Sequence, residues 1–410
     1  MAESRNINLE FLQTVINQTD PGIVVRNFKT TLGSQRGDNY ASMVYRVKVY
    51  GDDEWTKSMV IKLLPENEQV RENFKSNILF ENEKKFYKIA LNALMQYQGS
   101  KNLREPFDNT PKCFFAENDV IVLEDMRCDG YQTMDRMTPL DLNQCREYLR
   151  VLGKFHGLSL SMKVNEPEKF ETYVKRAISE VFFTKDNVPW YSGMYSQSAE
   201  NAKNTLESVL NENEKAKYLN VFQKYVSHGS LFEYHSKLVA KQNALSVLCH
   251  GDSWKNNFLC RYSDDGGVCD VKMIDFQMVR YGSPALDLAL LLYSCTSADL
   301  RKKHLPKLLQ VYCKTVADVL EQTNCLDHYP DIDQKLNNEF REFTEFGLRE
   351  AILWIPFILS DAEDTPDIYN ESPLEEQPIA GPTFPTTTCG KTKQIIVDLV
   401  TQLVDDGYLK

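Results

Sequence analysis

The stretch that decides the fold is LCHGDSWKNNF, residues 248–258, followed by IDFQ at residues 274–277. Apolar residues flank a polar loop that offers a carboxylate at Asp252, a carboxamide at Asn257 and, further on, a second carboxylate at Asp275. Phosphoryl transfer needs metal ligands and a carboxylate that orients the attacking hydroxyl, because position and charge stabilise most of its transition state. These residues therefore predict a phosphoryl-transfer centre.

The length and composition are those of an ordinary globular protein. With 410 residues, of which 42% are hydrophobic and 26% charged, the chain is long enough for two lobes and a sizeable core. Its 47 basic and 58 acidic residues give a net charge of -11, which is the wrong sign for a general binder of nucleic acid or anionic membranes. A phosphate-bearing ligand must therefore be held by a local arrangement of residues.

The cysteines and the amino terminus predict a cytoplasmic protein. The ten cysteines include no CxxC pair, and the six histidines form no zinc-binding pattern, so we expect reduced thiols. Residues 1–6 lack the basic segment and apolar run of a signal peptide. No apolar run approaches the roughly 20 residues that span a membrane. We therefore expect neither a membrane nor a nucleic acid as partner.

The first part of the chain is predicted to be a sheet with helices. Apolar residues at helical spacing predict a leading helix over residues 7–17, and alternating residues predict an antiparallel meander of three strands. A long helix and two further strands should follow. The expected strands are 23–32, 40–50, 55–64, 112–116 and 120–124, and the long helix is 72–96.

The second part is predicted to be mainly helical. A core helix is expected over residues 142–162, whereas the polar and aromatic region 166–241 allows no fine assignment. Short strands should bracket the opening stretch, and helices should dominate beyond residue 285. The acidic, proline-rich segment 361–388 is either an ordered wrap or a mobile loop. The expected strands are 247–249, 258–261 and 268–274, and the closing helix is 393–405.

The spacing HxDxxxxN from His250 to Asn257, with Asp275 after an apolar strand, resembles the corresponding motifs of protein kinases. The chain is similar to the phosphotransferases related to aminoglycoside and choline kinases, and more closely to the ecdysteroid kinase-like family. This resemblance extends from about residue 20 to about residue 360. It rests on HGDSWKNN at 250–257, IDFQ at 274–277, GSPALDLA at 282–289, RGDNYAS at 36–42 and VLEDM at 122–126.

The resemblance implies an α+β, protein-kinase-like fold with two lobes. Residues 1–126 would form a small nucleotide-binding lobe, made of an antiparallel sheet and one long helix, with the hinge at residues 124–126. Residues 127–410 would form a larger, mainly helical lobe. That lobe would carry the catalytic loop at 250–257 and the metal-binding motif at 275–277.

The resemblance also implies roles for residues of the second lobe. Asp252 would be the catalytic aspartate, which accepts the proton of the substrate hydroxyl. Asn257 and Asp275 would hold magnesium, a hard cation that prefers oxygen ligands. His250 and Asp287 are interpreted as structural supports of the catalytic loop. Trp254 is expected either to line the substrate pocket or to pack within the lobe.

In the first lobe, the sequence VIKL at residues 60–63 is similar to the VAIK motif of kinases. Lys62 is thus expected to contact the inner phosphates of ATP. Its predicted partner on the long helix is Glu83. Glu81 is the alternative, although two residues of separation point it about 200° around the helix.

Main-chain groups are expected to hold the rest of the nucleotide. The segment 37–42 contains a single glycine and departs from the GxGxxG loop of protein kinases. Backbone amides near Asn39 and Tyr40, together with the hydroxyl of Ser42, are expected to cradle phosphate oxygens. The main chain of Glu124 and Met126 is expected to pair with the adenine edge.

Asp287 lies only twelve positions after Asp275, which leaves no room for a peptide-binding activation segment. The sequence therefore predicts an ATP- and magnesium-dependent kinase for a small-molecule hydroxyl. The resemblance implies an ecdysteroid or another lipophilic alcohol. Two alternatives stay open: a catalytically silent binder of nucleotide or steroid, and a choline- or aminoglycoside-type kinase with extra acidic residues at the acceptor site. The aromatic residues that would suit an apolar ring system, or equally an ordinary core, are Trp190, Tyr191, Tyr293 and Trp354.

Overall fold

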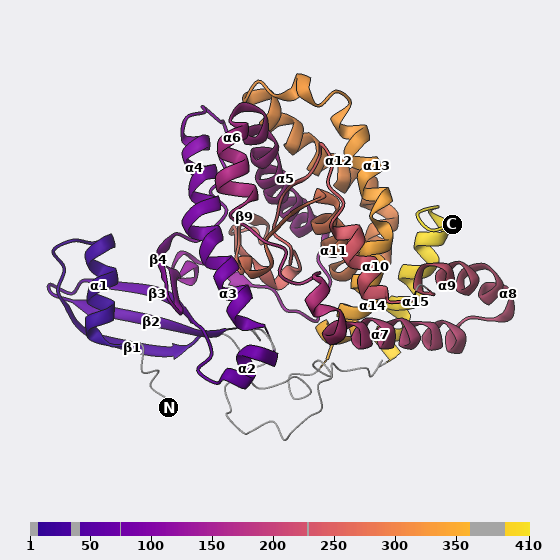
Figure 1. The fold of residues 1–410 in the computed structure, drawn as a ribbon, viewed down its shortest axis with the longest axis horizontal. Coiled ribbons are helices and arrows are strands. Elements are labelled where there is room, and N and C mark those ends of the chain that lie inside the picture. Colours follow the sequence, from indigo (N-terminus) through magenta and orange to yellow (C-terminus); the bar gives the residue numbers. More distant parts are fainter. Residues whose placement is uncertain (1–6, 34–41, 74, 228, 361–389) are drawn as a thin grey trace.

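The computed structural model describes residues 7–33, 42–73, 75–227, 229–360 and 390–410. A five-stranded antiparallel sheet forms one part, and a mostly helical part, with two small sheets, follows it in the chain. Figure 1 shows the sheet on the left, α3 and α4 beside it, and the helices filling the rest. The predicted α+β class is confirmed. Segment 361–388 and residues Asn39 and Tyr40 lie outside the described residues.

The sheet has the strand order β1-β2-β3-β5-β4 and confirms the predicted meander. Helix α1, residues Leu9–Thr19, is capped by Asn8, whose side chain accepts a hydrogen bond from the backbone of Phe11. Its apolar side packs on one face of the sheet and buries Val15 and Ile16 there. The strands are β1 (Val25–Leu32), β2 (Met43–Gly51), β3 (Thr56–Leu63), β4 (Cys113–Glu117) and β5 (Val120–Glu124).

The long helix expected over residues 72–96 is interrupted near its start. Lys75 has a φ of 54°, a left-handed conformation that a helix cannot continue through, so α2 ends before it. Beyond it the helical path runs unbroken, through a turn of π-helix at η1. The segments are α2 (Glu68–Asn73), α3 (Ser76–Lys85), η1 (Phe86–Ala90) and α4 (Leu91–Gly99).

The second part is built around α5, residues Leu142–Asn165, which begins with a capping box formed by Asp141 and Gln144. Helix α12 packs along it. The region left unassigned by the sequence, 166–241, is mainly helical. The helices are α6 (Pro167–Lys169), α7 (Val188–Val209), α8 (Glu212–Glu214), α9 (Asn220–Val226), α10 (Leu231–Val239), α11 (Pro284–Cys295), α12 (Ala298–Gln322), α13 (Ile332–Glu342), α14 (Thr344–Ile358) and α15 (Gly390–Asp405).

Two small sheets carry the predicted catalytic loop. Strand β7 leads into the loop and pairs with β10, while β8 leads out of it and pairs with β6 and β9. Backbone pairing thus fixes both ends of the loop. The strands are β6 (Gln132–Thr133), β7 (Val247–Cys249), β8 (Phe258–Tyr262), β9 (Val268–Met273) and β10 (Arg280–Gly282).

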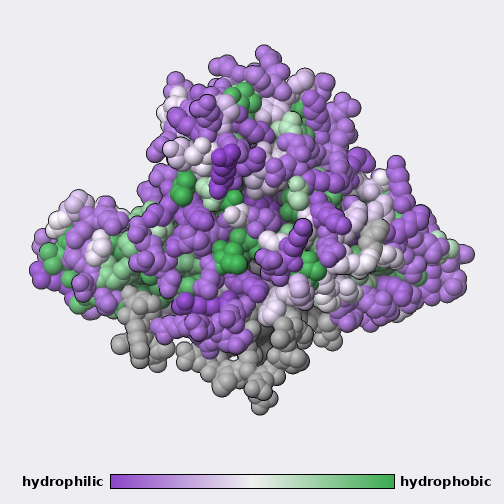
Figure 2. All heavy atoms as spheres, viewed as in Figure 1, coloured by the Kyte–Doolittle hydropathy of each residue, from purple (hydrophilic) through white to green (hydrophobic). Residues whose placement is uncertain are grey.

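The surface agrees with the charge balance of the sequence. Figure 2 shows hydrophilic residues over most of one face, with hydrophobic residues scattered among them. The cysteines within the described ranges are free thiols, as the sequence predicts. None of the helices in the described part of the chain has the length and hydropathy that crossing a membrane requires.

Gly347 provides a test of the packing between α11 and α14. A Cβ at this position would lie 2.4 Å from Cδ2 of Tyr293 and 2.7 Å from Cβ of Ala289. Overpacking of a filled core costs about 1–3 kcal/mol, so we expect Gly347→Ala to lower the free energy of unfolding by that amount in urea denaturation. Gly99→Ala, where nothing lies within 4 Å of the new Cβ, is the control and should change stability by less than about 0.5 kcal/mol. Equal stability of both variants would contradict the close helix contact.

Candidate active site

A cleft of about 690 Å³ opens between the sheet and the helical part. Its volume lies in the range of small-molecule sites. Both parts contribute to its wall, which joins residues from distant points of the chain. Five predicted site residues line it: Lys62, Glu124, Met126, Asn257 and Asp275.

Lys62 lies between two carboxylates at the inner end of the cleft. Its Nζ is 2.6 Å from Oε2 of Glu83 and 2.7 Å from Oδ1 of Asp275. Burial alone would lower the pKa of Lys62, but the charges of Asp275 and Glu83 outweigh burial and raise it. Glu81 points elsewhere, with its carboxylate 2.7 Å from Nζ of Lys84. Of the two glutamates weighed from the sequence, Glu83 is the partner of Lys62.

The loop at residues 250–257 is held by one buried carboxylate. Asp287 accepts hydrogen bonds from the backbone N–H of His250, at 2.7 Å, and of Gly251, at 2.9 Å. Burial would raise the pKa of Asp287, but its hydrogen bond and charge interaction with His156 lower it, and the carboxylate stays ionised. The ring of His250 is bonded in turn, since its Nε2 donates to the carbonyl of Ile274 at 2.9 Å. This geometry is that of a support for the loop.

Gly251 is the point where this loop turns most sharply. Its φ is +83°, and a Cβ here would lie 1.8 Å from the carbonyl oxygen of Met278. Only glycine therefore fits. The sharp turn leads directly to Asp252.

Asp252 and Asn257 are joined across the loop. The Nδ2 of Asn257 donates to the carbonyl oxygen of Asp252 at 2.8 Å and to its Oδ2 at 2.9 Å. Burial, and after it the negative charge of Asp275, raise the pKa of Asp252 to about 7. A carboxylate with a pKa near neutrality is suited to accept a proton at physiological pH.

The residues at the cleft fit a hard divalent cation. Because Nδ2 of Asn257 is committed to Asp252, its Oδ1 is available, and no described residue donates to it. Asp275 uses Oδ1 for Lys62, which leaves Oδ2. Asp275 also has a φ of 66°, a strained conformation for a residue other than glycine. Carboxylate and amide oxygens are the ligands that Mg²⁺ prefers in proteins.

Phe276, the residue after Asp275, belongs to a stack of aromatic rings. The ring of Phe276 lies 3.9 Å from that of Phe86 and 4.6 Å from that of His250, measured between centroids. The stack joins the helical segment beside the sheet to the loop. The sequence marked Phe86 only as one apolar residue of a helix, so this contact required the structure.

The remaining predicted residues are less informative. Ser42 is buried just before β2, and Trp254 is partly buried and packs on the main core. Sequence reasoning missed the apolar wall of the cleft, which includes Val44, Leu259 and Ile274. It also missed the ion pair of Arg46 with Asp125, at 2.6 Å. These apolar residues fall within the expected strands 40–50, 258–261 and 268–274, but the sequence did not predict that they face the cleft.

Comparison with protein-family models identifies the family of the chain. A model of the ecdysteroid kinase-like family matches residues 36–325. The chain belongs to the ecdysteroid kinase-like family. This makes it a small-molecule phosphotransferase of the kinase-like fold that acts on hydroxyl groups. A comparison with curated protein sequences finds no match.

Three solved structures to which the chain is similar are distant from it in sequence. A macrolide 2'-phosphotransferase type I is 15% identical with a TM-score of 0.36, over 85% of this chain and 97% of that one. An ethanolamine kinase of Plasmodium vivax is 14% identical with a TM-score of 0.38, over 85% and 88%. An aminoglycoside 2'-phosphotransferase in its GDP complex is 13% identical with a TM-score of 0.33, over 82% and 99%.

The pair of Lys62 and Glu83 can be tested through stability alone. Glu83→Gln removes one of the two charges beside a buried ammonium, and we expect it to lower the free energy of unfolding by about 1–3 kcal/mol. Glu81→Gln is the matched control on the same helix. Its exposed pair with Lys84 should be worth about 0–1 kcal/mol. Denaturant unfolding of both variants measures the difference, and equal losses would contradict the burial of the Glu83 pair.

Proposed function

We propose that the chain is an ATP- and magnesium-dependent kinase that phosphorylates a hydroxyl of a small lipophilic alcohol, such as an ecdysteroid. The observation that carries this proposal is the arrangement at the cleft. Lys62 joins Glu83 to Asp275 at the cleft that Asn257 also lines, and Asn257 donates a hydrogen bond to Asp252 within the same short loop. In a chain of this family, these are the parts that phosphoryl transfer requires.

The nucleotide would lie along the cleft. Apolar side chains, including Val44 and Leu259, suit the faces of an adenine ring, and the main chain of Glu124 and Met126 lies at its edge. Lys62 would contact the inner phosphates. The backbone amides of Asn39 and Tyr40, which are expected to cradle the phosphates, lie outside the described residues. Ser42, whose hydroxyl is expected to contribute, directly precedes β2.

The transfer itself exchanges one phosphorus–oxygen bond for another. The acceptor oxygen forms a bond to the γ-phosphorus while the bond from that phosphorus to the bridging oxygen breaks, and its electron pair leaves with ADP. Asp252 accepts the proton of the acceptor hydroxyl and later releases it to solvent. Asn257 orients Asp252 through the hydrogen bond at 2.9 Å. Position and charge supply the catalysis.

Asn257 and Asp275 would hold the magnesium ion through the oxygens that remain available. A magnesium ion held there would supply positive charge against the phosphates of the nucleotide. Lys62 contributes a second positive charge at the same end of the cleft, since it contacts Asp275 directly.

The segment after Asp275 supports a small acceptor. It continues at once into η7 (Phe276–Met278) and β10, which pairs with β7, and α11 begins at Pro284. These elements use up the short distance to Asp287. A peptide-binding activation segment has no place between them.

The charges on the acceptor side favour a neutral alcohol over choline or an aminoglycoside. Glu350 is buried and accepts hydrogen bonds from Tyr195, at 2.5 Å, and Trp354, at 2.9 Å. Glu180 accepts two backbone N–H groups and lies 3.2 Å from Nε of Arg280. Both carboxylates are therefore committed to partners within the protein. Phe183 and Tyr195 pack among several other aromatic rings of the buried core.

A catalytically silent binder is the other candidate from the sequence. Silent relatives of kinases are expected to lack part of the metal and phosphate machinery. Here Lys62, Asp252, Asn257 and Asp275 are all present, and each contacts another member of the set or its support. No observation favours the silent binder.

Incubation with labelled ATP tests the proposed function directly. We expect the protein to transfer one phosphate to a hydroxylated steroid or another neutral lipophilic alcohol, with magnesium required, and to leave choline and aminoglycosides unmodified. Sugars and plant-type phenols complete the panel, and mass spectrometry identifies the product. Transfer to choline alone would contradict the charge argument, and transfer to none of these acceptors would contradict the activity.

The pH dependence of the reaction tests the role of Asp252. Its pKa of about 7 means that the carboxyl is protonated below neutrality and cannot then accept the hydroxyl proton. We therefore expect kcat/KM for the alcohol to rise with pH through about 7 and to level off above it, because kcat/KM reports the free enzyme.

Asp252→Asn is the control for this pH profile. It should still bind nucleotide, lose about a hundredfold or more of the transfer rate, and show no such pH step. Near wild-type turnover in this variant would show that another group accepts the proton.

A further inference from the structure

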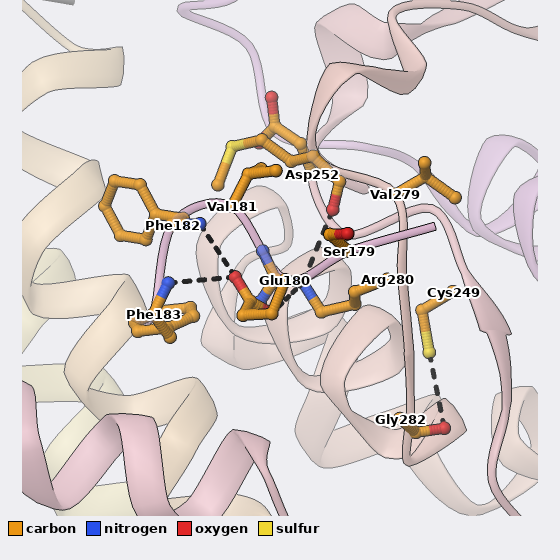
Figure 3. A network of polar contacts seen from close by, with 12 residues as sticks. Ser179, Glu180, Val181, Phe182, Phe183, Cys249, Asp252, Val279, Arg280 and Gly282 are labelled. Carbon is orange, nitrogen blue, oxygen red and sulfur yellow. Dashed lines mark hydrogen bonds and ion pairs between the residues drawn. The ribbon is translucent and has the colours of Figure 1, made fainter. Parts of the chain in front are cut away.

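The charged groups beside Asp252 have partners within the protein, as Glu180 illustrates. Its carboxylate accepts hydrogen bonds from the backbone N–H groups of Phe182 and Phe183 and lies 3.2 Å from Nε of Arg280 (Figure 3). Groups that are paired in this way offer little to a further ligand. Cations without a carboxylate partner gather elsewhere, on the wall of a second cavity.

This second cavity has a volume of about 880 Å³, which lies in the range of small-molecule sites. It follows α5 and α12, which Figure 1 shows side by side, and is bordered by residues 104–109 and the start of β9. The two helices run in the same direction, because Gly153 and Gly157 lie against Thr315 and Val319 in that order. None of the residues that line this cavity also lines the cleft.

Helix α5 places a row of cations along the second cavity. Arg146, Arg150 and Lys154 recur at every fourth residue, so they share one side of the helix over roughly 12 Å of its axis. Helix α12 adds Lys314, and the segment before β4 adds Arg104. Five basic side chains from three segments therefore line one cavity.

Two of these cations are neutralised within the wall. Nη1 of Arg150 pairs with Oε1 of Glu147, which is one turn away on α5. Nζ of Lys154 lies 3.2 Å from Oε2 of Glu105. The remaining three cations have no such partner.

Arg104, Arg146 and Lys314 form no ion pair with any described residue. The other two carboxylates of the wall do not offset their charge. Asp270 is bonded to side chains outside the wall, and Asp318 stands one turn from Lys314 beyond the distance of an ion pair. Three unpaired cations thus share the cavity with one unpaired carboxylate.

The three unpaired cations are spread along the length of the cavity. Arg146 lies in the second turn of α5. The backbone N–H of Arg104 donates at 2.7 Å to the side chain of Gln322, the last residue of α12. Lys314 lies between them, on the stretch of α12 that packs against Gly153. Because the two helices run in the same direction, the two arginines mark opposite ends of the cavity.

This excess of positive charge contrasts with the net charge of -11 of the whole chain. A concave wall with charges of one sign concentrates their field on whatever enters it. The planar fork of a guanidinium matches the oxygens of a phosphate group. Arginines at two ends of a cavity therefore suit a molecule with a phosphate group at each of its own ends.

The inner wall of the cavity is apolar and is tied to β9. Val151, Val271 and Val319 line it and are buried. Asn109 donates through Nδ2 to the carbonyl of Val271 at 2.7 Å, and its own carbonyl accepts from the backbone of Met273 at 2.7 Å. Asn109 is 4% exposed, and its Oδ1 has no hydrogen-bond partner among the described residues. A hydroxyl of a bound ligand, or a water molecule, can supply the missing donor.

We propose that the second cavity binds a small soluble molecule that carries two phosphate groups, one near Arg146 and one near Arg104, with Lys314 between them. The ligand would lie beside β9, the strand that leads to Asp275. Binding makes and breaks no covalent bond. The proposal does not rest on the kinase activity.

Calorimetry with fructose that is phosphorylated at both ends, here fructose bisphosphate, tests this site. ADP is present at saturation so that the cleft does not contribute, and fructose monophosphate and fructose are the matched ligands. We expect the bisphosphate to bind about tenfold or more tightly than the monophosphate, because its second phosphate contacts a second arginine, and fructose not to bind. No measurable binding of the bisphosphate, or equal affinity for both phosphates, would overturn the proposal.

Arg146→Gln and Arg104→Gln assign the binding to this cavity. Both side chains are exposed and unpaired, so we expect folded variants that bind the bisphosphate about fivefold or more weakly. Lys302→Gln removes an exposed charge of α12 outside the cavity wall and should leave the affinity within about twofold. Thermal unfolding verifies the fold of each variant. Wild-type affinity in both arginine variants would overturn the proposal.

Cys269 gives a second measure of occupancy, since it is exposed and lines the cavity. Cys128 is also exposed but lies outside the wall, and it serves as the internal reference. We expect fructose bisphosphate to slow the alkylation of Cys269 by iodoacetamide about threefold or more and to leave that of Cys128 unchanged, as measured by peptide mass spectrometry. Equal effects on both thiols would overturn the placement of the ligand.

Phosphatidylcholine vesicles that contain phosphatidylinositol bisphosphate separate a soluble ligand from a lipid headgroup. We expect the protein not to bind them. Binding to these vesicles that Arg146→Gln abolishes, without binding of the soluble bisphosphate, would overturn the proposal in favour of a lipid. None of these measurements involves turnover, so a protein that phosphorylates no alcohol but binds the bisphosphate would contradict the proposed function alone.

Discussion

The rest of the site depends on the ammonium of Lys62, held between Glu83 and Asp275. This contact joins a strand of the sheet, the helix beside it and the segment that follows β9. None of the three groups is easily buried alone, because burying an unpaired charge is costly. Together the positive charge and the two negative charges offset one another, so the protein can enclose all three groups. Separating these three charged groups would leave a charge unpaired inside the protein. The cost of doing so holds the sheet and the helical part in a fixed arrangement on the two sides of the cleft.

The loop at residues 250–257 depends on a second buried carboxylate. Asp287 comes from α11 and bonds the backbone of His250 and Gly251, so the loop is shaped by a group that takes no part in the chemistry. Its conformation leaves Asp252 partly buried, with a pKa raised to about 7 by burial and by the charge of Asp275. The same packing that holds the loop therefore prepares the carboxylate to accept a proton.

The two sides of Asp252 differ in chemistry. Towards the cleft stand Lys62, Asn257 and Asp275, whose charges and oxygen atoms suit phosphates and a divalent cation. On the other side, the carboxylates of Glu180 and Glu350 are bonded within the protein and aromatic rings surround them. The proposed neutral, lipophilic acceptor would bring no charge that needs an unused partner there.

The sequence by itself determined the fold class, the family, the meander of strands and the set of Lys62, Glu83, Asp252, Asn257 and Asp275. It could do so because these features depend on local spacing: periodicity predicts elements, and short motifs fix which polar residues share a loop. It misplaced the start of the long helix, because the left-handed backbone at Lys75 has no sequence signal at a lysine. The tertiary structure alone decided the contacts between distant residues, such as Phe86 with Phe276 and Glu180 with Arg280. These pairs lie far apart in the chain, and only the packing of α3 against the helical part brings them together.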